Sequence, residues 1–252
     1  MDTLSLDTLF IGKNRFNFEE IDSTNEWLII QNSLKKIPDG TIVVANNQIK
    51  GKGQRGSQWI SEVNNSLTFS ILLRPRFILP SQTFDISICI ALAIHNCLDE
   101  LCFGFSIKWP NDIFFEDKKI AGVLIENQFR KGEYQNAIIG VGLNVNQNNF
   151  NDLPNAISLK QILGLSFPID KVMYRICELL EGFYLQLRAG NFNTLKSKYI
   201  SCLYGYNKWR LFKTKEDIFQ GKIVDIHRNG YIQLKLLNGD FQDFEIKQLK
   251  FI

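Results

Sequence analysis

The side chains best suited to chemistry in this sequence lie in one glycine-rich segment, residues 51–59. Three glycines within six positions allow the backbone to reach positive φ and to approach a ligand closely, so that successive amides can converge on an anion. Lys52 and Arg55 add positive charge, and Trp59 offers a flat apolar face on which an adenine ring can stack. The segment therefore predicts a site for a phosphate-bearing nucleotide.

The same glycine spacing also fits less specific interpretations. It matches the dinucleotide-binding fingerprint, but that motif needs a helix at the last glycine and an acidic residue about 20 positions later. Here residues 66–73 read as a β-branched and aromatic strand, and Arg74 and Arg76 stand near the later position. The sequence also lacks the Gly-Lys-Ser/Thr motif of a Walker loop and the His-Arg-Asp and Asp-Phe-Gly motifs of a protein kinase. A solvated glycine turn stays open as the alternative to an anion site.

A second cluster surrounds the turn at Pro110. Lys108 and Asp112 bracket this turn, and Lys119 follows on the next expected strand. A two-residue hairpin tip at 117–118 places Asp112 and Lys119 on one face of the sheet, whereas a three-residue tip places them on opposite faces. In either register about 13 Å would separate them, which suits the two ends of a nucleotide conjugate better than an acid–base pair. The alternative is that Lys119 and its neighbour are solvated tip residues.

The composition excludes several classes of protein. A net charge of +3 over 252 residues is too small to indicate a nucleic-acid partner by itself. No run approaches the roughly 18 apolar residues of a membrane span, and no secretory signal is visible. Five cysteines without metal-ligand spacing indicate free thiols of a cytoplasmic protein, and two histidines are too few for a histidine-based site. Chemistry must rest on lysine, arginine, carboxylates and backbone amides.

Helices and strands occur in mixed order along the first 203 residues. Ser23, three residues ahead of Glu26, predicts a capping box that opens a helix ending near Lys35. Apolar spacing predicts further helices at 83–102, 170–189 and 193–202, and strands at 41–45, 66–73, 105–109, 112–115, 119–126 and 137–145. Because strands and helices do not alternate strictly, the order predicts an α+β domain with a mixed sheet.

The sequence changes character near residue 204. Short strands are expected at 209–212, 221–226, 231–237 and 240–244. The pairs Asn229-Gly230 and Asn238-Gly239 are strong signals for two-residue hairpin turns. We therefore predict two domains, residues 1–203 with the candidate site and residues 204–252 as a small β-barrel.

Five segments, taken together in this order and spacing, resemble the biotin–protein ligases (biotin–[acetyl-CoA-carboxylase] ligases). They are residues 23–25, 48–59, 108–112, 119–122 and 140–146, and the likeness extends over nearly the whole chain. The resemblance implies an α+β catalytic domain of the class II synthetase type followed by an SH3-like barrel. Only 22 residues precede Ser23. This is too few for the N-terminal DNA-binding domain of some members, so no DNA binding is expected.

The resemblance also implies a two-step reaction. The carboxylate of biotin attacks the α-phosphate of ATP in the presence of Mg²⁺, which gives biotinyl-5′-AMP and pyrophosphate. A lysine of a biotin carboxyl carrier domain, part of a biotin-dependent carboxylase, then takes the biotinyl group and releases AMP. A cytoplasmic homodimer without a membrane partner is expected. Two alternatives stay open: a lipoate or octanoate ligase or transferase of the same fold, and a non-catalytic biotin-binding module.

Residues that match the motifs of the family take the roles that the resemblance implies. The biotin-binding residues are Ser23, Thr24, Gln48, Gly51, Lys52, Lys119 and Gly122. The nucleotide-binding residues are Gly53, Gln54, Arg55, Gly56, Trp59 and Asn144. The catalytic residues, which must bring two anions together, are Lys52, Arg55, Lys108, Asp112 and Lys119. Mg²⁺ is expected mainly on the phosphates of ATP, with Asp112 as the candidate protein ligand.

Two positions depart from the pattern of the family. Gln54 stands where many members have an arginine, so the glycine-rich segment carries less charge with which to retain the adenylate. Residues 64–66 replace the usual Gly-x-Asn entry to the next strand, so no role is carried over there.

Overall fold

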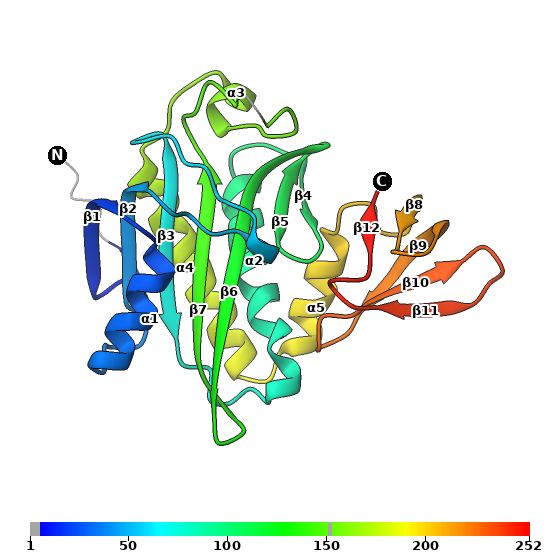
Figure 1. Cartoon of the computed structure of the whole chain (residues 1–252), viewed down its shortest axis with the longest axis horizontal. Helices are drawn as coiled ribbons and strands as arrows, with labels where there is room; N and C mark the ends of the chain where they lie inside the picture. The colour runs from blue at the N-terminus through cyan, green and yellow to red at the C-terminus, as the bar shows by residue number, and fades with distance from the viewer. Residues whose placement is uncertain (1–5, 151–152) are drawn as a thin grey trace.

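A computed structural model describes residues 6–150 and 153–252, apart from the side chain of Arg55. Its centre is a seven-stranded sheet in the order β1-β2-β3-β7-β6-β5-β4 (Figure 1). The strands are β1 (Arg15–Ile21), β2 (Ile42–Gln48), β3 (Ser66–Leu73), β4 (Phe105–Lys108), β5 (Asp112–Phe115), β6 (Lys118–Arg130) and β7 (Glu133–Asn144). β1 runs parallel to β2, and the other neighbouring pairs are antiparallel. The predicted α+β domain with a mixed sheet is confirmed.

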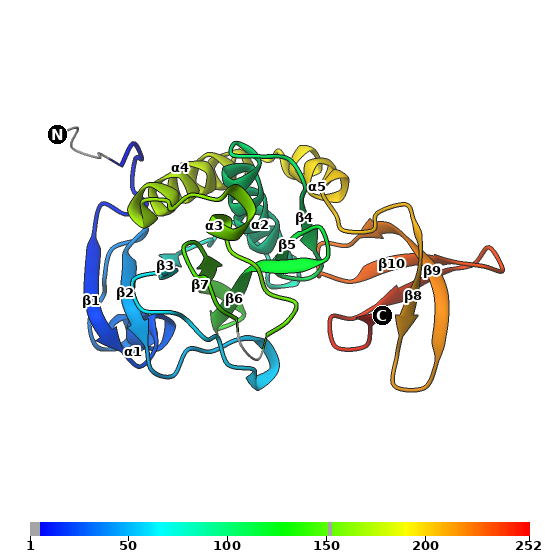
Figure 2. The ribbon, with the colours of Figure 1, turned by 90° about the horizontal axis from the view of Figure 1, so that it is seen from above.

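Helices cover the two faces of this sheet unequally (Figure 2). One face carries α2 (Phe84–Asp99), α4 (Ile169–Arg188) and α5 (Phe192–Ser201), and the opposite face carries α1 (Thr24–Leu34). A short helix, α3 (Leu159–Leu163), follows β7, and two 3₁₀ turns lie at Gln54–Gly56 and Pro80–Gln82. α1 packs mainly against β2, β3 and β7, and Asn25 in its first turn also donates to the carboxylate of Glu126 on β6 at 2.8 Å.

The strand β3 lies at the centre of the hydrophobic core. All of its positions are buried because α1 packs on one face and α4 on the other. Such two-sided burial explains why its sequence lacks a regular alternation of apolar and charged residues.

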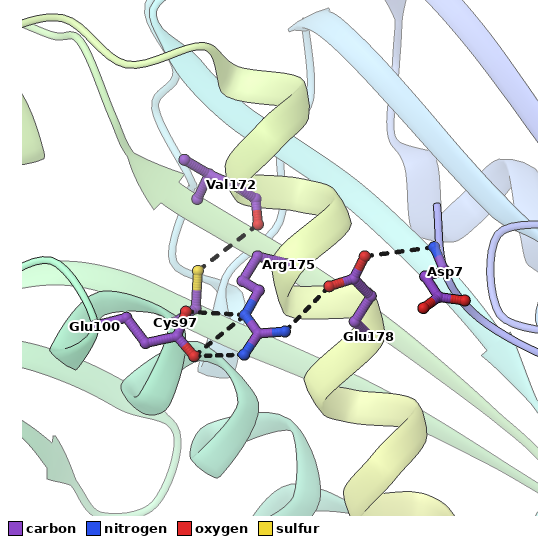
Figure 3. Close-up of polar contacts among 6 residues, drawn as sticks. All are labelled: Asp7, Cys97, Glu100, Val172, Arg175 and Glu178. Atoms are coloured by element: carbon purple, nitrogen blue, oxygen red, sulfur yellow. Dashed lines mark hydrogen bonds and ion pairs between the residues drawn. The ribbon is translucent and has the colours of Figure 1, made fainter. Parts of the chain in front are cut away.

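The two long helices behind the sheet, α2 and α4, are joined by polar contacts, some exposed and one buried (Figure 3). The guanidinium of Arg175 on α4 donates to both carboxylate oxygens of Glu100 and to Glu178. Cys97 on α2 donates its thiol to the carbonyl of Val172 at 3.8 Å. The described chain contains no disulfide, and all five cysteines are free thiols, as the sequence predicts.

The first turn of α1 confirms half of the predicted capping box. The hydroxyl of Ser23 accepts a hydrogen bond from the backbone N–H of Glu26. The carboxylate of Glu26 does not complete the box, because it accepts a hydrogen bond from Lys52 of the glycine-rich segment instead. Glu26, which was expected to complete the helix cap, therefore ties the glycine-rich segment to α1.

The C-terminal part forms a second, five-stranded antiparallel sheet in the order β11-β10-β9-β8-β12. Its strands are β8 (Trp209–Lys213), β9 (Ile218–Ile226), β10 (Ile232–Leu236), β11 (Phe241–Phe244) and β12 (Lys250–Phe251). Gly230 and Gly239 adopt φ of 90° and 93°, and both hairpin turns lie where the Asn-Gly pairs predicted them. Each turn contains three residues and not the expected two, because the backbone N–H of His227 donates to the carbonyl of Tyr231 and that of Leu236 to the carbonyl of Asp240. This sheet lies beside β4 and β5 (Figures 1 and 2). The exact boundary at residue 203 stays a prediction.

A hydrogen bond and an ion pair are among the side-chain contacts that attach the C-terminal sheet to the main sheet and its helices. The indole N–H of Trp109 donates to the carbonyl of Gly230 at 3.0 Å. Arg228 forms an ion pair with Asp85, a fully buried carboxylate in the first turn of α2. Within the described residues, no helix combines the length and the apolar character that a membrane crossing needs.

Candidate active site

A cavity of about 400 Å³ lies on the face of the main sheet that carries α1. This is within the size range of small-molecule sites. Its walls come from the start of α1, the segment after β2, the β4–β5 turn, the strands β6 and β7, and residues 246–251 of the C-terminal sheet. The predicted site residues that line it are Ser23, Thr24, Gln48, Lys52, Gly53, Gln54, Trp59, Lys108, Asp112, Lys119 and Gly122. Stretches far apart in the sequence therefore meet in one cavity.

Three predicted site residues lie outside this lining, namely Gly51, Gly56 and Asn144. Asn144 is buried and donates its amide to the carbonyl of Ile157 at 3.0 Å, which fixes the chain that follows β7. Its predicted contact with adenine stays a prediction. The role predicted for the side chain of Arg55 falls outside the described part of the structure.

A buried polar network stands at one end of the cavity, where α1 begins. The backbone N–H and the hydroxyl of Thr24 donate to Gln48 Oε1 at 2.9 and 3.0 Å. The Thr24 hydroxyl also lies 2.6 Å from the hydroxyl of Ser70, which donates to Asn25 Oδ1. Because each group is held by its neighbour, the polar atoms that face the cavity have fixed directions before any ligand binds.

Ser70 was not among the residues selected from the sequence, and Asn25 was noted only as part of a motif. A usable signal was present in β3, where Ser66, Thr68 and Ser70 alternate with apolar residues. Alternate residues of a strand share a face, so this pattern places three hydroxyls on one side of an otherwise apolar strand. In a fully buried strand, that arrangement indicates polar partners on that side.

The glycine-rich segment folds back on itself and crosses the face of the sheet (Figures 1 and 2). Lys52 and Gln58 form an isolated antiparallel bridge, and the backbone N–H of Trp59 donates to the carbonyl of Gly51 at 3.0 Å. Lys52 is anchored to Glu26, whose hydrogen bond raises the pKa of the lysine. The segment is therefore a closed loop tied to α1, and it places Lys52 and Trp59 at the cavity.

The floor of the cavity is formed by glycines on two neighbouring strands. Gly122 of β6 and Gly142 of β7 are partners in the ladder, and Gly140 lies on the same face of β7. A Cβ at Gly142 would lie only 2.2 Å from Trp59 Cε2, and one at Gly140 would lie 2.6 Å from Asn25 Oδ1. Trp59 and Asn25 can occupy these positions only because the backbone beneath them carries no side chain.

Asp112 and Lys119 form an ion pair in the cavity, with Lys119 Nζ 2.7 Å from Asp112 Oδ1. The expected separation of about 13 Å is therefore wrong. The pair lies over Gly122, where a Cβ would come within 3.1 Å of Lys119 Nζ and 3.4 Å of Asp112 Oδ1. Lys119 Nζ also lies 5.8 Å from the centre of the Trp59 ring. Lys119 is thus a positioned cation inside the site and not a solvated tip residue.

The register of the hairpin explains the difference. The tip consists of residues 116–117, one position earlier than expected, because Glu116 adopts the left-handed conformation with φ of 51°. Lys119 therefore pairs with Phe114, which lies two residues from Asp112 along β5 and on the same face. The remaining gap is short enough for the lysine side chain to span.

Lys108 enters the cavity from β4 and is surrounded by aromatic rings. Its Nζ lies 4.4 Å from the ring centre of Phe114, 5.6 Å from that of Tyr204 and 5.4 Å from that of Phe251. Burial lowers the pKa of Lys108, and the carboxylate of Asp112 opposes this shift. Among the described residues, no carboxylate forms an ion pair with Lys108. Its charge is therefore free to meet an anion in the cavity.

Comparison with known proteins adds independent information. The model of the biotin/lipoate A/B protein ligase family matches residues 17–144, which include the glycine-rich segment, the β4–β5 turn and the glycine floor. The chain belongs to this family. The biotin/lipoate ligase match ends at the last residue of β7, so it covers the main sheet and not the C-terminal sheet.

Individual relatives carry more specific names. The bifunctional ligase/repressor BirA of Bacillus subtilis is 32% identical over 208 residues, which cover 80% of this chain and 63% of the relative. The biotin–[acetyl-CoA-carboxylase] ligase of Paracoccus denitrificans is 32% identical over 106 residues, 41% of this chain and 43% of the relative. The chain thus spans less than two thirds of the length of either curated relative.

A solved family structure extends the likeness to the whole fold. The biotin protein ligase of Aquifex aeolicus in complex with biotin and ATP superposes with a TM-score of 0.80 at 26% identity. The match covers 95% of this chain and 100% of the Aquifex chain, so both sheets are included.

Proposed function

We propose that this chain activates biotin with ATP and transfers the biotinyl group to a lysine of a biotin carboxyl carrier domain. The observation that carries the proposal is the meeting of Lys108 and the Lys119–Asp112 pair with the polar network of Thr24 and Gln48 in one cavity. The similar Aquifex aeolicus ligase was solved in complex with biotin and ATP, which supports the choice of both substrates.

The polar network at the start of α1 is suited to the ureido ring of biotin. That ring presents one carbonyl acceptor and two N–H donors, and Ser23, Thr24 and Gln48 supply fixed hydroxyl and amide groups at the cavity wall. The glycine floor leaves room for the apolar part of the acid, with Val123 and Val141 beside it. The carboxylate end of the acid would then lie toward Lys119.

Lys119 and Lys108 meet the main electrostatic demand of the first step. A carboxylate oxygen of biotin attacks the α-phosphorus of ATP, a P–O bond breaks, and pyrophosphate leaves with its electron pair. Two anions must approach each other, so fixed cations that are already in place lower the barrier. Asp112 holds Lys119 toward the cavity, and Lys52 and Lys108 face the same space from other sides. Trp59 offers its ring to the adenine.

In the second step the ε-amine of the carrier lysine attacks the acyl carbon of biotinyl-5′-AMP. A C–N bond forms, the C–O bond to AMP breaks, and the amine loses a proton. Lys119 and Lys108 stabilise the departing AMP phosphate by the same charges that served the first step. The loop that carries Lys52 and Trp59 shields the intermediate from water while Glu26 holds it to α1.

Mg²⁺ is treated as part of the ATP substrate. Among the described residues, no group of three or more histidine, cysteine, aspartate or glutamate side chains could hold a metal ion. Asp112, the candidate ligand, is engaged by Lys119. The residues present therefore do not form a protein-built metal site, and Mg²⁺ would enter on the phosphates.

The test combines the purified chain with biotin, Mg·ATP and an isolated biotin carboxyl carrier domain. With biotin and Mg·ATP but no carrier, we expect release of pyrophosphate. When the carrier is added, we expect its mass to increase by one biotinyl group on the acceptor lysine. A carrier whose acceptor lysine is replaced by arginine serves as the control. An unmodified carrier at saturating substrates would refute the proposed ligase.

The two alternatives give different results in the same experiment. A lipoate or octanoate enzyme would release pyrophosphate with those acids and not with biotin. A non-catalytic binding module would bind biotin tightly in calorimetry and release no pyrophosphate.

A further inference from the structure

The aromatic rings around Lys108 come from two different parts of the molecule. Phe114 belongs to β5 of the main sheet, and Phe251 belongs to β12 of the C-terminal sheet. Tyr204 lies between them, with its ring centre 5.6 Å from that of Phe114 and 6.1 Å from that of Phe251. The rings therefore form a continuous cluster across the junction, and Lys108 lies at its edge in the cavity wall.

Phe251 connects this cluster to the core of the C-terminal sheet. It pairs with Phe212 across the β12–β8 ladder, and the two ring centres are 5.1 Å apart. Phe212 is fully buried and also faces Phe219 at 6.3 Å. The Phe251 ring is thus anchored in the core of the C-terminal sheet.

Four lysines line the cavity, and the three that the sequence singled out differ in what holds them. Lys119 is held by Asp112, and Lys52 is held by Glu26. Lys108 is held by aromatic faces, which stabilise an ammonium group without neutralising it. A lysine held in this way has no carboxylate partner that competes with a phosphate, whereas a lysine in an ion pair does.

We infer that Phe251 is a positioning residue, through which the C-terminal sheet places the Lys108 ammonium for the phosphates of ATP. The inference rests on the proposed function, because it takes a nucleotide phosphate as the anion that Lys108 meets. Phe251 acts on the ammonium through its ring face, so the ring matters more than the apolar volume.

The test compares ring removal with ring retention at position 251. Phe251→Leu keeps an apolar side chain and removes the ring face, whereas Phe251→Tyr keeps the ring. We expect Phe251→Leu to weaken ATP binding in calorimetry by about three- to tenfold, in line with a partly desolvated cation–π contact. Phe251→Tyr should bind ATP as the unaltered protein does. Biotin affinity should be the same in all three proteins.

A matched control exists within the same sheet. Phe241 on β11 also faces a lysine, Lys235, with its ring centre 5.8 Å from the ammonium, but neither residue lines the cavity. Phe241→Leu should leave ATP binding unchanged. If Phe241→Leu and Phe251→Leu weaken ATP binding equally, the effect belongs to the sheet as a whole and the inference is overturned.

A double-mutant cycle decides whether Phe251 acts through Lys108. In the Lys108→Met background, adding Phe251→Leu should change ATP affinity by less than twofold. An equal additional loss in both backgrounds would overturn the inference, and so would unaltered ATP affinity in Phe251→Leu alone. Calorimetry measures ATP affinity in each variant without requiring catalytic turnover. Pyrophosphate release by the unaltered protein separately tests the proposed function, so the two failures are distinguishable.

Discussion

The ring of Trp59 lies directly on the backbone of Gly142, so closely that a Cβ at position 142 would come within 2.2 Å of Trp59 Cε2. The two residues come from a loop and a central strand that are far apart in the sequence. Their contact fixes the orientation of the ring from below, while the hydrogen bond from the Trp59 N–H to Gly51 fixes the loop itself. The ring that would stack on adenine is therefore positioned by the sheet.

Gly142→Ala should displace this ring and weaken nucleotide binding. Stacking of a base on an aromatic ring contributes about 1–3 kcal/mol, so we expect the Kd for ATP to rise by about tenfold in calorimetry. Gly182→Ala is the matched control, because it adds a methyl group where no atom lies within 4 Å. It should leave ATP affinity unchanged and stabilise α4 by about 0.5–1 kcal/mol. Equal ATP affinities in the two variants would refute the role of Trp59.

Lys119→Ala should strongly slow adenylate formation without unfolding the protein. Removing one preorganised charge-stabilising group lowers the rate of such reactions by about 10²–10³-fold, and we expect this range for pyrophosphate release. The Lys119 and Asp112 side chains are 35% and 25% exposed, so loss of the pair should cost less than about 1 kcal/mol of stability. Lys50→Ala breaks an exposed pair with Asp22 outside the cavity lining and should leave the rate unchanged. A wild-type rate in Lys119→Ala would remove Lys119 from the mechanism.

Arg228→Met should destabilise the protein in a pH-dependent manner. Burial raises the pKa of Asp85, and Arg228 opposes that rise. Without Arg228 the folded-state pKa rises further, so the loss of stability is largest at neutral pH and shrinks as the pH falls toward the ordinary carboxyl range. We expect a loss of about 2 kcal/mol at pH 7.5 in urea unfolding and a smaller loss at pH 5.

The control for this prediction is Arg175→Met, which removes a surface ion pair with Glu100. Arg175 lowers the pKa of Glu100, so that contribution is lost only as the pH falls below the ordinary carboxyl range. Its effect should be below about 1 kcal/mol and similar at pH 5 and pH 7.5. A loss in Arg228→Met that grows toward acid would contradict the assignment to Asp85.

The three buried cysteines should resist alkylation in the folded protein. Burial raises the pKa of Cys97 and of Cys177 to about 12, and that of Cys89 as well, so almost no thiolate is present at pH 8. Cys102 and Cys202 are only half-buried. Intact mass after iodoacetamide treatment should show at most two additions in the folded protein and five in urea. Three or more additions before unfolding would contradict the buried positions.

Local signals in the sequence predicted most of the main domain. The helix cap at Ser23 and the buried run of β3 each depend on neighbouring residues, and the structure contains both. In the C-terminal sheet the Asn-Gly pairs predicted the places of two turns but not their length. β1 was missed because it is an exposed edge strand in which glutamates interrupt the apolar pattern. The short elements α3 and β12 gave too little periodicity to be recognised.

The candidate site was predicted less completely, because its geometry depends on register and on distant contacts. A shift of one residue at the hairpin tip brought Lys119 to Asp112, and no local pattern distinguishes the two tips. The rings of Tyr204 and Phe251 reach Lys108 only through the docking of the C-terminal sheet. The homodimer and the lack of DNA binding stay predictions, because neither depends on a feature of this single folded chain.

The glycines of β6 and β7 impose a shared constraint on how this protein can diverge. Trp59 comes from a loop, Asn25 from α1 and Lys119 from the start of β6, yet each rests where a side chain of the sheet is missing. Loops can exchange charged residues one at a time and retune the chemistry by degrees. A single methyl group on the strands beneath would instead dislodge the group above it at once. Sequence variation among related proteins should therefore accumulate in the loops around the cavity, whereas the glycines of its floor should stay unchanged.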